Sequence, residues 1–445
     1  MTVEVEISPV AEKAGLCTDF DHVVFYVSSP KLVATYLQKV FGFSLYATKG
    51  LETGSRDVSA TVVCNGNVKF ILMGAIRPLH QRPDNPLVDD IHRHIASHGD
   101  SVKDVAFQST QLEAFVENLK SKNALNLLVN PDSQSDSHIT AINDEFGTFR
   151  YITVNGKNDT VHTIIDRSGY SAFMPGYKIW ENPLYVDCNR SAIQLDAIDH
   201  CVQNQDWNEM INVCNFYKEI FNFHQFWSVD EKQVYTEFSA LKSTVMASEN
   251  EVIKMPVNEP AVGLKKSQIE EFVEFYGGSG TQHIAIRTHN IIDTIKKMKE
   301  NGAEFIEIPD SYYDNLEKKL KQHKHPKIKE SLKLIKKYGI LVDFDENGYL
   351  LQLFTKPVFE RPTFFFEIIQ RANHNGFGAG NFKGLFEVLE KDQERRGNLT
   401  TQNVQDYTKG LVDKPNKPNK PVKPQIKDEV TDDDIADAIN YMNLE

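Results

Sequence analysis

The sequence predicts an α+β fold of two tandem domains. Each domain is expected to contain paired β-α-β-β-β modules that form an open, curved and mainly antiparallel barrel. Three observations predict this fold: a duplicated strand with a histidine near its start, a helical stretch with the same ending in both halves, and later landmarks at matching intervals. A chain of 445 residues is long enough for two or three domains, and internal repetition of this kind indicates duplicated structural units.

The first two elements of each half match in order. Residues 20–27 and 198–202 have the pattern of strands, each with a histidine near its start. Helical stretches follow at residues 31–43 and 208–223, and each of them ends at a Phe-x-Phe triplet. The two halves therefore begin with the same strand and helix.

Later landmarks keep the same order and spacing. His22 lies 82 residues before Asp104, and His200 lies 83 residues before His283. Further on, an acidic turn with a glycine precedes a strand in both halves, with an offset of 201 residues. We therefore expect a first barrel domain at residues 18–175 and a second barrel domain at 190–400.

The last part of the chain differs in composition from both barrels. Residues 401–445 contain a stretch that alternates lysine and proline, and an acidic tail follows. Alternating prolines favour an extended linker rather than a packed core. We expect a linker and tail here.

Composition excludes several classes of protein. No N-terminal apolar run resembles a signal peptide, and no apolar segment of about 18 residues could span a bilayer. The net charge of −13 disfavours nucleic-acid and anionic-membrane partners. The five cysteines lack a metal-site spacing and read as reduced thiols of a cytoplasmic protein. The lysine-rich run at 318–337 reads as the solvated side of a helix pair.

Comparison of the halves isolates a candidate metal site. With the offset of 201, Asp166 takes the place of Glu367, so the first half offers one histidine and two aspartates at the matched positions. The second half offers two histidines and one glutamate: His200, His283 and Glu367. Two imidazoles and one carboxylate form the facial triad of non-haem iron(II) oxygenases, which leaves three adjacent positions open on the metal. We therefore expect an iron site in the second barrel and no metal site in the first.

Each ligand has an ordinary structural alternative. A single histidine at a strand start is more often a hydrogen-bonded core residue. Glu367 lies in an almost wholly apolar strand, where a carboxylate is costly to bury without a cation. That cation could be a metal or a buried arginine or lysine.

Other candidate motifs are weaker. His94 and His98 are four residues apart, as in zinc-binding helices, but they lack a nearby third ligand and the glutamate of a HExxH motif. We expect both at the surface. The glycine-rich stretch 376–380 lacks the Lys-Ser/Thr ending of a phosphate loop, and it reads as a flexible turn before a helix.

Residues 348–400 resemble the C-terminal signature of the 4-hydroxyphenylpyruvate dioxygenase family. Residues 198–200 and 280–285 resemble its two histidine motifs, and the first half resembles the family at Arg56 and at residues 98–100. The resemblance covers residues 18 to 400 and implies a fold of the vicinal oxygen chelate type. It implies the following site residues: Gln282, Gln352 and Phe354 as catalytic residues; Ser243, Asn258, Gln268, Phe365, Phe377 and Phe382 as substrate-binding residues; His200, His283 and Glu367 as metal ligands.

The resemblance also implies one Fe(II) per chain and a reaction. It is the conversion of 4-hydroxyphenylpyruvate and O2 to homogentisate and CO2, by oxidative decarboxylation, ring hydroxylation and side-chain migration, in tyrosine and phenylalanine catabolism. Two alternatives stay open: benzylic hydroxylation of the same substrate, as in hydroxymandelate synthase, and a non-catalytic binding protein of the same fold. We also expect a homodimer.

A lid over the substrate pocket is a further expectation. Residues 375–394 combine glycines with apolar residues at helical spacing. Glycines tolerate backbone angles that other residues resist, so this stretch reads as a glycine-hinged helix that closes the pocket. The alternative is that the apolar face is ordinary core.

Overall fold

The computed structural model describes seven stretches of the chain: 16–81, 85–129, 138–180, 192–229, 239–322, 327–377 and 382–401. Contacts divide the chain into one unit at Met1–Gln402 and a second at Asn403–Glu445. Nearly all of the predicted linker and tail lies outside the described residues. The division of the first unit into domains at residues 175 and 190 stays a prediction.

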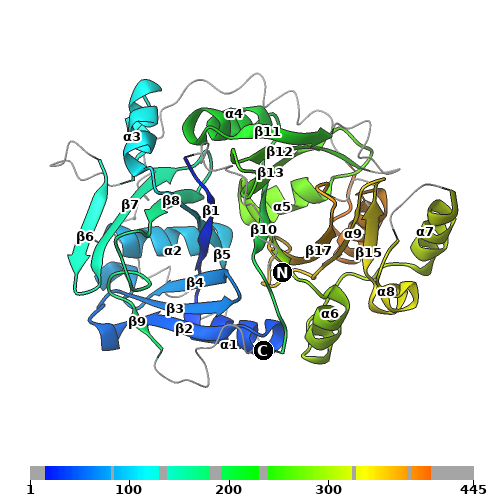
Figure 1. Cartoon of the computed structure of the whole chain (residues 1–445), viewed down its shortest axis with the longest axis horizontal. Coiled ribbons are helices and arrows are strands. Elements are labelled where there is room, and N and C mark those ends of the chain that lie inside the picture. Colours follow the sequence, from blue (N-terminus) through cyan, green and yellow to red (C-terminus); the bar gives the residue numbers. More distant parts are fainter. Residues whose placement is uncertain are drawn as a thin grey trace, which may run out of the picture. The chain divides into compact units, whose positions relative to one another are not determined.

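The first half contains two successive β-α-β-β-β modules (Figure 1, blue to teal). Its strands are β1 Asp19–Tyr26, β2 Ser44–Lys49, β3 Val58–Asn65, β4 Val68–Ala75, β5 Ser101–Gln108, β6 Thr140–Asp144, β7 Gly147–Asn155, β8 Val161–Asp166 and β9 Lys178–Ile179. Its helices are α1 Pro30–Phe41, α2 Pro86–His98 and α3 Leu112–Ser121, with short 3-10 turns η1 Leu51–Thr53, η2 Leu79–Gln81 and η3 Leu125–Leu127.

The second half repeats this order and adds helices (Figure 1, green to orange). Its strands are β10 Ile198–Asn204, β11 His224–Val229, β12 Ala240–Ala247, β13 Lys254–Ala261, β14 Gly280–Arg287, β15 Leu341–Phe344, β16 Tyr349–Phe354 and β17 Phe365–Ala372. Its helices are α4 Met210–Phe221, α5 Gln268–Tyr276, α6 Ile291–Glu300, α7 Asp310–Gln322, α8 Leu332–Tyr338 and α9 Phe382–Arg395.

The two sheets have equivalent strand orders, which confirms the predicted duplication. The first sheet runs β6-β7-β8-β5-β1-β4-β3-β2-β9, and the second runs β15-β16-β17-β14-β10-β13-β12-β11 when read in the same direction. Most neighbouring strands are antiparallel, and the parallel pairs, such as β1 with β4 and β10 with β13, occur at equivalent places. The predicted α+β class with mainly antiparallel sheets is therefore confirmed.

Strand register corrects one of the matched positions. In the second sheet Phe354 lies opposite Glu367, and in the first sheet Thr153 lies opposite Thr163. The strands β7 and β16 keep the offset of 201 residues, but β8 and β17 are offset by 204 because the connection before β17 is three residues longer. Thr163, and not Asp166, therefore occupies the position of Glu367.

Alternation along β17 explains how an apolar strand carries a glutamate. Phe364 and Phe366 pack against the first half, with ring centroids 5.1 Å from Phe25 and 5.6 Å from Phe70. Successive side chains of a strand point to opposite faces, so Glu367 points away from this core. The outer face of β17 thus holds the two halves together while the inner face carries the carboxylate.

A second contact between the two halves is formed by β8 and α4. The ring of His162 is stacked on Phe107, and its Nε2 lies 3.0 Å from the hydroxyl oxygen of Tyr217. Its Nδ1 lies 2.9 Å from the carbonyl oxygen of Val105. Both nitrogens of this buried ring therefore have partners, as buried polar groups require.

Three composition-based predictions can be compared with the structure. None of the described helices is both long and apolar enough to cross a membrane. The lysine-rich run forms the helices α7 and α8, which bury Leu316 and Ile335 and expose their lysines, as predicted; His323 and His325 lie outside the described residues. The expectation of reduced cysteines is wrong for Cys64, which is disulfide-bonded, whereas Cys17, Cys201 and Cys214 are free.

Candidate metal centre and its pocket

Three strands of the second sheet bring the candidate ligands together. His200 comes from β10, His283 from β14 and Glu367 from β17. Glu367 Oε2 lies 3.2 Å from His200 Nε2 and 3.5 Å from His283 Nε2, and all three side chains are buried. Their candidate ligand atoms lie within 4.8 Å of one another, so a single small cation could contact all three.

A β-bulge sets the direction of His200. The pairing of β10 with β14 shifts register between Ile198 and His200, which leaves Asp199 as the extra residue. Asp199 Oδ1 lies 2.8 Å from His200 Nδ1, and both Asp199 oxygens accept hydrogen bonds from Arg371. This contact directs Nε2 of the ring toward Glu367, as carboxylate partners of metal-bound histidines do.

His283 is oriented by a neighbouring amide. Gln282 Oε1 lies 3.0 Å from His283 Nδ1, and the ring is stacked on Phe365 with centroids 4.8 Å apart. In the described residues, the amide nitrogen of Gln282 also donates to Gln268 Oε1 at 3.4 Å. Both imidazoles therefore use Nδ1 for an outer partner and present Nε2 to the carboxylate.

Charge favours an ionised carboxylate at the centre. Burial opposes the ionisation of Glu367, but the charge of His200 and hydrogen bonds from both imidazoles outweigh it and lower the pKa of Glu367 to about 2. Burial lowers the pKa of His283, which favours its neutral ring, whereas the charge of Glu367 outweighs burial and raises the pKa of His200. An anionic oxygen beside a neutral imidazole nitrogen is a donor set suited to a divalent transition metal.

A small cavity of about 70 Å³ adjoins the three ligands. Most of the expected pocket residues line it: Ser243, Asn258, Gln268, Gln282, Phe354, Phe365 and Phe377. Gln352 is buried in β16, two residues before Phe354, but it is not part of the lining. Phe382 begins α9, and its side chain lies outside the described part of the structure.

The lining also contains residues that the sequence did not assign to the site, together with Leu389 of the expected lid: Val202, Trp227, Leu241, Val245 and Pro256. Val202 could have been found, because it lies two residues after His200 and therefore on the same face of β10. Leu241, Val245 and Pro256 belong to β12 and β13, and only the pairing of these strands reveals which residues face inward.

Comparisons with known proteins agree with this geometry. The family model described as Glyoxalase/Bleomycin resistance protein/Dioxygenase superfamily matches residues 197–353. The chain is 48% identical to the 4-hydroxyphenylpyruvate dioxygenase of Coccidioides posadasii, over 85% of this chain and 94% of that protein. The corresponding enzyme of Yarrowia lipolytica is 47% identical, over 90% and 100% of the two chains, and that of Danio rerio is 44% identical, over 88% and 95%.

The chain belongs to the 4-hydroxyphenylpyruvate dioxygenase family. Among solved structures, a triple mutant of 4-hydroxymandelate synthase from Streptomyces coelicolor is similar, with a TM-score of 0.70 and 24% identity over 85% of this chain and 99% of that one. This likeness shows the shared fold and confirms the tandem architecture. These relatives, which match over most of the chain, are all named as dioxygenases, so the alternative of a non-catalytic binding protein is not supported.

In the first half of this chain, the positions equivalent to the candidate ligands do not form a comparable metal-ligand set. Thr163 donates to Asp104 from its hydroxyl, at 2.5 Å, and from its backbone nitrogen, at 3.0 Å. Asp166 instead accepts from Arg150 and Ser168. In the described residues, the matched positions therefore offer an imidazole and a carboxylate that is already hydrogen-bonded.

The prediction that His94 and His98 lie at the surface is wrong, since both side chains are buried. The fold brings Asp159 to them from 61 to 65 residues further along the chain, with its Oδ2 at 2.7 Å from His94 Nδ1 and 3.3 Å from His98 Nε2. This set has metal-ligand spacing. However, the ammonium of Lys103 lies 3.1 Å from Asp159 and already supplies the positive charge, so we interpret the cluster as a partly buried ion-pair network.

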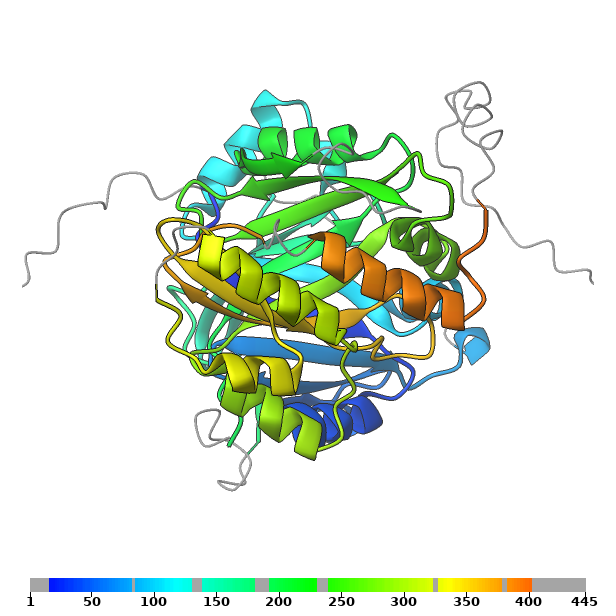
Figure 2. The same cartoon turned by 90° about the vertical axis from the view of Figure 1, so that its right-hand side faces the viewer.

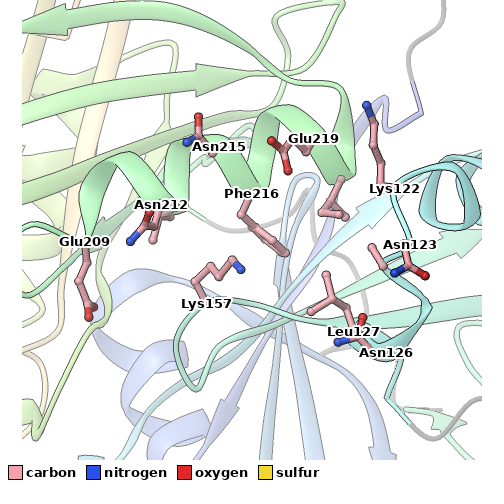
Figure 3. A pocket seen from close by; sticks show the side chains of 13 residues that line it. Lys122, Asn123, Asn126, Leu127, Lys157, Glu209, Asn212, Asn215, Phe216 and Glu219 are labelled. Atoms are coloured by element: carbon pink, nitrogen blue, oxygen red, sulfur yellow. The ribbon is translucent and has the colours of Figure 1, made fainter. Parts of the chain in front are cut away.

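A surface cleft of about 530 Å³ lies between α4 and the segment around η3 (Figure 3). Its lining is rich in amides and lysines, and the ammonium of Lys157 lies 6.0 Å from the ring centre of Phe216. The cleft includes none of the candidate metal ligands. It is therefore separate from the candidate metal centre.

Proposed function

We propose that this chain converts 4-hydroxyphenylpyruvate and O2 to homogentisate and CO2 with one iron(II), bound by His200, His283 and Glu367. The observation that supports this proposal most strongly is the buried group of two imidazoles and one ionised carboxylate beside an aromatic cavity. Iron(II) bound there would supply three adjacent open positions and the redox chemistry of O2 activation.

The charges of the pocket support binding of the substrate through a metal. Among the described residues that line the cavity, none is a lysine or an arginine, and Glu367 is anionic. The carboxylate of a 2-oxo acid would therefore find no lysine or arginine partner in this lining if no metal were present. A divalent metal on the three ligands provides the missing positive charge and accounts for the choice of an anionic substrate.

The protein's own groups orient and enclose the substrate. Phe354, Phe365 and Phe377 form aromatic walls that suit a phenol ring. Ser243 and Asn258 lie directly opposite each other on β12 and β13, and together they present a hydroxyl and an amide to the cavity. We propose that these groups, with Gln268 and Gln282, position the polar ends of the substrate and exclude water during the reaction.

Product analysis tests the proposed reaction. The purified chain is incubated with 4-hydroxyphenylpyruvate, iron(II) and ascorbate, and the products are separated and identified. We expect homogentisate, with one O2 consumed and one CO2 released for each molecule formed. Hydroxymandelate would instead show benzylic hydroxylation, and a requirement for 2-oxoglutarate would contradict the proposal. A homodimer and a cytoplasmic location also remain proposals, which sedimentation and cell fractionation can test.

A further inference from the structure

The barrel of the first half contains a cavity of about 600 Å³. Its lining includes His22, Asp104, Thr153 and Thr163, which are the register equivalents of His200, His283, Phe354 and Glu367. The cavity therefore occupies the place in the first sheet that the catalytic pocket occupies in the second. Its volume lies within the roughly 300–1,000 Å³ typical of small-molecule sites.

The walls of this cavity, here called the N-terminal cavity, are mainly apolar and aromatic. Ile71 and Met73 come from β4, Phe149 and Tyr151 from β7, and Tyr177 from the segment before β9. Aromatic and aliphatic walls of this kind favour a planar ring. A hydrated ion alone would gain little from them.

One charged group of the lining lacks a counter-charge. The ammonium of Lys49, at the end of β2, lies 5.4 Å from the ring centre of Tyr177, and burial lowers the pKa of Lys49 with no carboxylate acting on it. Among the described residues no ion pair involves Lys49, whereas the acids Asp90 and Asp159 both contact Lys103. A half-buried ammonium at an apolar cavity is costly unless an anion joins it.

We propose that the N-terminal cavity binds a small, single-ring aromatic carboxylate. The ring would lie against the aromatic walls, and the carboxylate would accept hydrogen bonds from Lys49. Thr163 and Asp104 are already hydrogen-bonded to each other, so the ligand would bind without a metal. This inference does not depend on the function proposed for the second half.

Binding of 4-fluorophenylacetate to the full-length chain, followed by fluorine NMR, tests the proposal. We expect Lys49→Met, which removes the charge and keeps the length of the side chain, to weaken one binding site by about tenfold or more, because a charge-assisted contact is lost. Thr153→Phe copies Phe354 into the N-terminal cavity and should weaken the same site by narrowing it. Glu367→Gln, in the catalytic half, should leave that site intact.

Lys69→Met is the matched control. Lys69 is a half-buried lysine of the same sheet, on β4, and its pKa is also lowered by burial, but it does not line the cavity. We expect this variant to bind the probe as the wild type does. Thermal unfolding of each variant confirms that it is folded. Unchanged binding in folded Lys49→Met and Thr153→Phe would overturn the proposal, and so would a wild type that binds the probe only at a site lost in Glu367→Gln.

Discussion

At the scale of single residues, both halves use an aspartate and an arginine to orient a histidine, but the other residues around that histidine differ. In the first half, Asp21 contacts His22 Nδ1 at 2.6 Å and accepts hydrogen bonds from Arg167. Asp199 and Arg371 repeat this arrangement around His200. The oriented histidine is thus a property of the duplicated fold, and the imidazole of His283 and the carboxylate of Glu367 distinguish the second half.

This repetition supplies a prediction with an internal control. Asp199→Asn should weaken iron(II) binding by about 10- to 100-fold, because outer partners of metal-bound histidines have effects of this size. Competition with a chelator measures the iron affinity. Asp21→Asn makes the same change in the first half and should leave that affinity unchanged. Equal losses in both variants would indicate a general effect on folding instead.

At the scale of elements, part of the site could be predicted because strands and motifs are local patterns. The start of β10 and the histidine of β14 follow from sequence spacing alone. The matched position of Glu367 could not be found by spacing, since three additional residues before β17 change the offset, and only strand pairing shows that Thr163 is its equivalent. The burial of His94 could not be predicted either, because its partner Asp159 is 65 residues away.

The predicted lid is an element whose backbone is partly described. The helix α9 begins at Phe382, lies next to α5, and is drawn in orange in front of the second sheet in Figure 2. Gly376 does not have a positive φ. A side chain there would instead clash with the ring of His374, since an added Cβ would lie 2.5 Å from it. Gly378 and Gly380 lie outside the described residues, so the hinge stays a prediction.

The cavity beside the candidate metal ligands is small, and the predicted lid contributes to its wall. About 70 Å³ is far below the roughly 300 Å³ at which small-molecule sites usually begin, and Phe377 and Leu389 from the region of α9 are part of the wall. We expect Phe382→Ala to keep its iron but to consume more O2 than the homogentisate it forms, because a poorly closed pocket admits water. An oxygen electrode and product analysis give this ratio.

Deletion of the tail is the control for the lid. A chain that ends at Asp413 should keep both its activity and the ratio of O2 to product, because the predicted linker separates the tail from the barrel. Unchanged coupling and substrate affinity in Phe382→Ala would assign the helix to packing alone. An inactive deletion variant would show that the closing element extends further along the chain.

At the scale of the whole molecule, the catalytic half depends on the first half for its packing. The contact of His162 with Tyr217, which links the two halves, should make the stability of the protein depend on pH. Burial lowers the pKa of His162 to about 4, whereas the unfolded chain protonates this histidine at about 6.5. Between these values the unfolded state binds more protons, so stability is full above about pH 6.5 and falls as the pH decreases toward 4.

Across this pH range, the protonation of His162 alone should lower the free energy of unfolding by about 3 kcal/mol. Denaturant unfolding at several pH values between 4 and 7 measures it. We expect His162→Gln to be less stable at pH 7, because it loses the stacked ring, but to have a flatter dependence on pH in this window. The same slope in the variant and the wild type would show that other groups cause the acid sensitivity.

The most direct test of the proposed catalytic centre is the iron content of the purified chain, measured beside that of His283→Asp. This substitution gives the second half the aspartate that the first half has at Asp104. We predict one iron(II) per chain in the wild type and essentially none in the variant, with activity lost in parallel. Two tightly bound irons in the wild type, or one fully retained iron in His283→Asp, would contradict the assignment of the metal to His200, His283 and Glu367.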